Sequence, residues 1–190
     1  MQTIAIQRDT RFSPHSVEKD YDILAAVAQP LNAKIIAENN LKAHHLAEAN
    51  IILNMGRLPH TLQMIEKYAA QKCVVNPTNG IRNCQRSLIT KLMRNANIPI
   101  PPQEGNKGYW LKRGDEAAQS ENDIIYCANK KQLQQAKTAF SKRGITNTVV
   151  QAHVEGDLVK FYGVNNTHFF RYYYPTDDGI TKFADEQHNG

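Results

Sequence analysis

Hydrophobic residues in the first 76 positions recur in two alternating patterns. Short apolar runs predict β-strands at Thr3–Gln7, Lys34–Ala37, Ile51–Asn54 and Cys73–Asn76. Between these runs, apolar residues recur every three or four positions, as they do from Val17 to Ala28, and this spacing predicts helices. Alternation of strands and helices with short connections predicts a parallel sheet covered by helices.

The pattern changes after residue 76. An apolar stripe at Leu88, Leu92 and Met93 predicts one helix from Arg82 to Asn95, which the prolines at 99, 101 and 102 terminate. A second helix follows Asn129, a good N-cap residue. Strands are expected at Tyr109–Lys112, Asp123–Cys127 and Thr148–Val154, followed by a hairpin over residues 157–164 and 168–174. We therefore expect two domains, one at residues 1–79 and one at residues 80–190.

Composition narrows the class of protein. The chain has 190 residues, of which 41% are hydrophobic, so it can bury the cores of one large or two small domains. No apolar run reaches the roughly 20 residues of a membrane helix, and the N-terminus lacks the pattern of a signal peptide. Three scattered cysteines fit reduced thiols better than a disulfide framework. We expect a cytoplasmic protein with no membrane partner.

Positive charge is concentrated in the middle of the chain. The formal net charge is +5, and residues 82–143 hold 12 basic and 5 acidic side chains, whereas residues 1–80 hold 8 and 7. Such a segment favours a polyanionic partner, either a nucleotide, a phosphorylated substrate or a nucleic acid. Solvated helix faces with no partner explain the same charge.

The predicted parallel sheet offers candidate binding residues at the carboxyl ends of its strands, where ligands of such sheets bind. The loop after the first strand contains no glycine, which excludes the dinucleotide fingerprint. Arg8, Asn54 and Arg57 lie at these ends and could hold an anionic substrate. The alternative is a surface ion pair of little consequence.

Four pieces of the second half occur in an order that resembles the ATP-grasp superfamily of carboxylate–amine ligases. They are a helix that begins near Arg86 and ends at Ile98-Pro99-Ile100-Pro101, the strand Tyr109-Trp110-Leu111-Lys112, the stretch from Val149 to Gly156, and the hairpin from Asp157. The N-terminal parallel sheet is similar to the Rossmann-like domain that precedes the grasp. The resemblance covers essentially the whole chain and implies an α/β protein with an incomplete α+β ATP-grasp domain.

The resemblance implies a role for particular residues. Lys112 and Arg86 would contact the nucleotide phosphates. Gln151 and Ala152 would bind the exocyclic amine of adenine, and the Val154 N–H would bind a ring nitrogen. Either Glu155 or Asp157 would hold the ribose. Two cations of the hairpin, Lys160 and Arg171, could face the phosphates or the substrate if they point to the same side.

Magnesium in this family is held by acidic residues late in the fold, and nothing after Tyr174 has their spacing. We therefore expect no metal ligands in this chain, a truncation before the metal-binding strands, and no ligase activity by the fragment alone. The resemblance implies ATP and Mg²⁺ as cofactors and a small carboxylate as substrate. The resemblance is also compatible with a homodimer.

A nucleic-acid-binding module that uses the basic 82–143 segment is the alternative function. Single-stranded nucleic acid is usually bound by aromatic residues interleaved with basic ones. Here that pattern is limited to Tyr109-Trp110 beside Lys112 and Arg113, so nucleic acid is the less favoured partner.

Overall fold

The computed structural model describes the whole chain except residues 15, 117, 119, 157–158, 165 and 174–190. Its N-terminal half is a four-stranded parallel sheet with the strand order β2-β1-β3-β4. The strands are β1 (Thr3–Gln7), β2 (Lys34–Ala37), β3 (Ile51–Asn54) and β4 (Cys73–Val75). The helices that connect them are α1 (Val17–Ala28), α2 (Ala43–Glu48) and α3 (Pro59–Tyr68).

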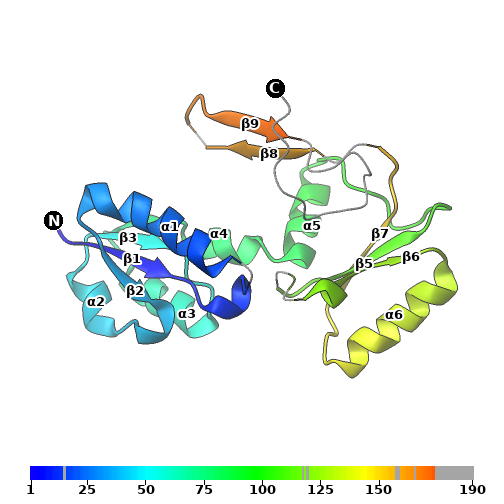
Figure 1. Ribbon diagram of the computed structural model, residues 1–190, viewed down its shortest axis with the longest axis horizontal. Coiled ribbons are helices and arrows are strands. Elements are labelled where there is room, and N and C mark those ends of the chain that lie inside the picture. The colour runs from blue at the N-terminus through cyan, green and yellow to red at the C-terminus, as the bar shows by residue number, and fades with distance from the viewer. Residues whose placement is uncertain (15, 117, 119, 157–158, 165, 174–190) are drawn as a thin grey trace.

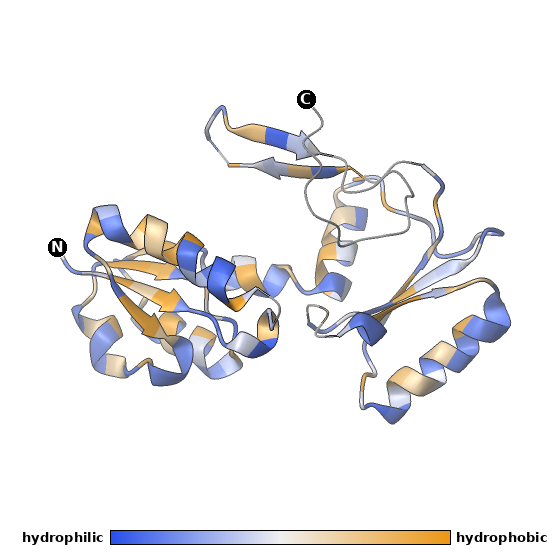
Figure 2. Ribbon diagram, viewed as in Figure 1, coloured by the Kyte–Doolittle hydropathy of each residue, from blue (hydrophilic) through white to orange (hydrophobic). Residues whose placement is uncertain are grey.

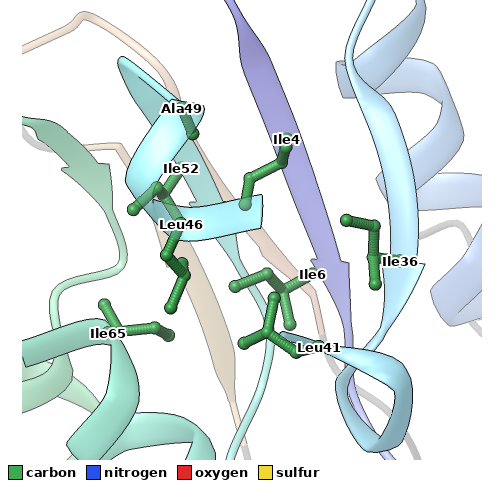
Figure 3. Close-up of a cluster of buried hydrophobic side chains, with 8 residues drawn as sticks. All are labelled: Ile4, Ile6, Ile36, Leu41, Leu46, Ala49, Ile52 and Ile65. Carbon is green, nitrogen blue, oxygen red and sulfur yellow. The ribbon is translucent and has the colours of Figure 1, made fainter. Parts of the chain in front are cut away.

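Helices cover both faces of this sheet because neighbouring strand residues point to opposite sides. Ile4, Ile6 and Ile52 pack with Leu46 of α2 and Ile65 of α3 on one face (Figure 3). On the other face, Ala5 and Leu53 pack against Leu24 and Ala28 of α1. The strands accordingly carry the most apolar residues of this half (Figure 2). The predicted parallel α/β architecture is confirmed.

Two helices lead from the parallel sheet to the second half (Figure 1), and they replace the single predicted helix over 82–95. They are α4 (Thr78–Asn83) and α5 (Arg86–Asn95). Gln85 between them has an extended backbone, with φ −57° and ψ 130°. The break lets Ser87 donate both its N–H and its hydroxyl to the carbonyl of Gly114, at 2.9 and 3.0 Å. A tertiary contact therefore overrides the helical pattern.

The second half contains a three-stranded antiparallel sheet with the order β6-β5-β7. The strands are β5 (Tyr109–Arg113), β6 (Ile124–Cys127) and β7 (Thr148–Ala152), and the helix α6 (Lys130–Lys142) packs on one face. Leu111 and Tyr109 pack there against Leu133, Ala136 and Phe140 of α6. Asn129 caps α6 as predicted, because its Oδ1 accepts the Gln132 N–H at 3.0 Å.

A separate antiparallel hairpin of β8 (Lys160–Gly163) and β9 (Phe170–Tyr173) ends the described chain, as the sequence predicted. None of the described helices is both long and apolar enough to cross a membrane. All three cysteines are free thiols. The domain boundary placed at residue 79 stays a prediction.

Candidate functional site

The face of the antiparallel sheet opposite α6 carries the predicted nucleotide-binding residues Lys112 and Gln151. Lys112 is in register with Val149, and Gln151 is in register with Trp110, so all four side chains point to this face. The Lys112 Nζ donates a hydrogen bond to the Gln151 Oε1 at 2.7 Å. The sheet thus holds a cation and an amide together, and both are half-buried.

An aromatic group lies beside this pair. The Trp110 ring has its centroid 5.3 Å from that of Tyr126 and 6.3 Å from that of His153, and the Tyr126 and His153 rings are 5.6 Å apart. The Trp110 Nε1–H donates to His153 Nδ1 at 3.1 Å, which fixes the two rings relative to each other. Flat rings of this kind can stack on a nucleobase.

The sequence analysis did not identify Tyr126 as part of this group. Tyr126 is in register with Trp110 across the antiparallel β5–β6 pair, so it points to the same face. The period of two in β6 could have identified it, because the core residues Ile125 and Cys127 alternate with it.

The segment that follows β7 contains the predicted adenine hinge. Ala152 is buried, and its N–H donates to the carbonyl of Pro102 at 2.6 Å. Val154 is 59% exposed, and within the described residues its N–H donates no hydrogen bond. Glu155, one of two candidates for the ribose, forms an exposed ion pair with Lys107. The other candidate, Asp157, lies outside the described residues.

Within the described residues, Arg86 hydrogen-bonds the backbone at the end of β5 and not Lys112 or Gln151. Its Nη1 donates to the carbonyl of Arg113, and burial lowers the pKa of its guanidinium. Arg86 therefore anchors the start of α5 to the end of β5. Two other cations of α5, Lys91 and Arg94, line a cavity of about 170 Å³ against β7, together with Gln151. The sequence reasoning did not single out either of them.

The three predicted substrate residues of the parallel sheet have different environments. Arg8 forms a bidentate ion pair with Asp20 of α1, with its Nε 2.6 Å from Oδ2. Asn54 is 1% exposed, and its amide donates to the carbonyl of Asn76 at 3.1 Å while its Oδ1 accepts the Gly56 N–H at 2.9 Å. Asn54 therefore shapes the loop after β3.

Arg57, the third of these residues, is half-buried, and burial followed by the charge of Arg8 lowers the pKa of its guanidinium. Its backbone N–H is held by the buried carboxylate of Glu38 at 2.9 Å. Glu38 also accepts the N–H groups of Leu58 and Asp9, and so ties the loops after β1 and β3 together. No sequence pattern indicated this role of Glu38.

The hairpin places Lys160 and Arg171 on one face. Tyr162 is in register with Arg171, and Lys160 lies two residues before Tyr162 on the same strand. Phe161, Phe170 and Tyr172 form a ring cluster on the other face, with centroids 5.8 to 6.5 Å apart. Lys160 and Arg171 therefore lie on the same side of the hairpin, as a shared role toward the phosphates or the substrate requires.

No group of three or more His, Cys, Asp or Glu side chains suited to a metal ion occurs within the part of the chain that the structure describes.

The parallel sheet followed by a helix-backed antiparallel sheet defines a mixed α/β protein. Among solved structures, the chain is similar to D-cycloserine synthetase DcsG, with a TM-score of 0.55 and 10% sequence identity. The match covers 84% of this chain and 64% of that chain, so this chain spans less than two thirds of that protein's length. At this identity the likeness shows the fold alone. No family model matches the chain, and no curated protein matches it.

Proposed function

We propose that this chain contributes the nucleotide-binding part of an ATP-dependent carboxylate–amine ligase. The observation that carries the proposal is the face of the antiparallel sheet opposite α6, where the Lys112–Gln151 pair lies beside the rings of Trp110, Tyr126 and His153. A compact ammonium group suits a phosphate oxygen, and an amide oxygen can accept from the exocyclic amine of adenine. The fold likeness to a synthetase is consistent with this function.

The bound nucleotide would lie across β5 and β7. In this arrangement the adenine base stacks on the rings of Trp110, Tyr126 and His153. The Ala152 carbonyl and the Val154 N–H bind the polar edge of the base, and Lys112 binds the phosphates. The hairpin cations Lys160 and Arg171 add positive charge for the phosphates or the carboxylate substrate. ATP supplies the phosphoryl group that activates a carboxylate, and the protein's share is positioning and neutralisation of charge.

Titration calorimetry with ATP, in the presence and absence of Mg²⁺, tests the proposal. Saturable binding that Lys112→Ala weakens at least tenfold supports it. The matched control is Lys142→Ala, because Lys142 is an exposed lysine at the end of α6, on the helix that covers the opposite face. Absence of ATP binding together with tight, steeply salt-dependent binding of single-stranded RNA would instead favour the nucleic-acid module.

A further inference from the structure

The cavity of about 170 Å³ lies between α5 and β7, the strand at one edge of the antiparallel sheet. One water needs roughly 10–15 Å³ of such space, so the cavity can hold an ion with several oxygen atoms. Its wall on α5 consists of residues spaced three and four apart, which therefore share one face of the helix: Ser87, Thr90, Lys91 and Arg94. Among the described residues that line the cavity there are two cations, Lys91 and Arg94, and no carboxylate.

Neither Lys91 nor Arg94 forms an ion pair with any carboxylate of the described residues. Helix α5 itself contains no acidic residue. Glu104, which follows the lining residue Gln103, is paired with Lys130 of α6 at 2.9 Å. Like charges one turn apart on a helix repel each other, so an anion held between Lys91 and Arg94 would relieve this repulsion.

Two uncharged donors belong to the wall on β7. Gln151 lines the cavity and accepts from Lys112 through its Oε1, so its Nε2 remains as a donor. The Ala152 N–H leaves the β5–β7 ladder for the carbonyl of Pro102, and by the alternation of a strand the Val150 N–H also points away from β5. Val150 lines the cavity, and within the described residues its N–H donates no hydrogen bond. Donors beside cations are the partners that an oxyanion needs.

A phosphoryl group matches this set of donors better than a carboxylate, because its oxygens point in several directions. The planar guanidinium of Arg94 can bind two of them in parallel, and the compact charge of Lys91 can bind a third. The hydroxyls of Ser87 and Thr90 donate to backbone carbonyls at 3.0 and 2.6 Å, so toward the cavity they can only accept. The Val150 carbonyl points the same way as its N–H. These acceptors suit the proton that a hydrogenphosphate ion carries.

We infer that this cavity binds a dianionic phosphoryl group, held by Lys91, Arg94 and the Gln151 amide, in addition to the nucleotide. The group is inorganic phosphate or the phosphate of a small ester. The rings of Trp110 and Tyr126 lie on β5 and β6, whereas the cavity lies at the β7 edge, so a base stacked on those rings leaves the cavity accessible. The inference stands on the cavity and its charges and does not depend on the proposed ligase function.

Titration calorimetry with inorganic phosphate, in a chloride buffer without ATP, tests the inference on the full chain. We expect saturable binding that the double variant Lys91→Gln, Arg94→Gln weakens at least about tenfold. Both positions are exposed on α5, and circular dichroism verifies that the variant folds. The matched control is Lys131→Gln, Lys142→Gln, which removes two exposed cations of α6 and should leave phosphate affinity within about twofold.

Two further titrations identify the ligand. Glycerol 3-phosphate in place of inorganic phosphate separates the two sources, because the ester binds more tightly only if its organic part also contacts the protein. ATP should not displace phosphate, and Lys112→Ala should lose ATP binding while it keeps phosphate binding, so that the two proposals fail separately. The inference is overturned if neither anion binds saturably, if the α6 control loses as much affinity as the α5 variant, or if ATP competes with phosphate.

Discussion

The Lys112 Nζ donates to the Gln151 Oε1 at 2.7 Å across the β5–β7 pair. The two residues are diagonal neighbours in the ladder, because Lys112 is in register with Val149 and Gln151 with Trp110. This hydrogen bond orients a flexible lysine on the face of the sheet opposite α6 before any ligand binds. Preorganisation of this kind lowers the entropy that binding must overcome.

Gln151→Ala should therefore weaken ATP binding. It removes an acceptor for the adenine amine and the hydrogen bond that Lys112 donates to Gln151, and one hydrogen bond contributes about 0.5–1.5 kcal/mol, a few-fold to roughly tenfold in affinity. Gln134→Ala, the same change at an exposed position of α6, should bind ATP within about twofold of the unaltered protein. Calorimetric titration of both variants measures the difference, and equal affinities of Gln151→Ala and Gln134→Ala would contradict the assignment.

Glu38 should be important for stability rather than for nucleotide binding. Its buried carboxylate accepts three backbone N–H groups, two of them at 2.9 Å. Glu38→Gln turns one acceptor oxygen into a donor that faces those N–H groups, so unfolding in urea should cost about 1–3 kcal/mol less. Glu48→Gln, on the exposed side of α2, should change stability by no more than about 0.5 kcal/mol. A Glu38→Gln protein as stable as the control would refute this role.

Asp9 should make stability depend on pH in the acid range. The Arg11 backbone N–H at 2.9 Å, and then the Asn39 amide, lower the pKa of Asp9 from 3.8 to about 2. A lowered pKa stabilises the fold above the unfolded value and ceases to do so as the pH falls through the folded value. The difference in free energy of unfolding between the unaltered protein and Asp9→Asn should be constant above pH 5 and shrink between about pH 4 and pH 2. Urea unfolding at several pH values measures it, and a constant difference down to pH 2 would contradict this assignment.

The hydrophobic pattern was sufficient to predict the parallel sheet and the order of its strands along the chain, because both faces of that sheet are buried and the two periods are clear. It was not sufficient at Gln85, where the contact of Ser87 with Gly114 ends one helix and starts another. The bond that breaks the helix joins residues 27 positions apart. No local pattern reports such a contact.

The candidate site was predicted in part. The apolar pattern predicted the strands that carry Lys112 and Gln151, and the family resemblance assigned roles to the two residues. The contribution of Tyr126 depends on the register between β5 and β6, which places it opposite Trp110. The alternation along β6 could place Tyr126 on one side of its strand, but only the pairing of β5 with β6 places it beside Trp110.

Fluorescence of Trp110, the only tryptophan of the chain, tests nucleotide binding at this face most directly. Because its indole lies with Tyr126 and His153 beside Lys112, an adenine ring stacked there should quench its emission in a saturable way. Lys112→Ala should require at least tenfold more ATP for the same quenching, and Lys142→Ala should titrate like the unaltered protein. Emission that ATP leaves unchanged, or quenching that Lys112→Ala does not shift, would contradict a nucleotide site on this face of the sheet.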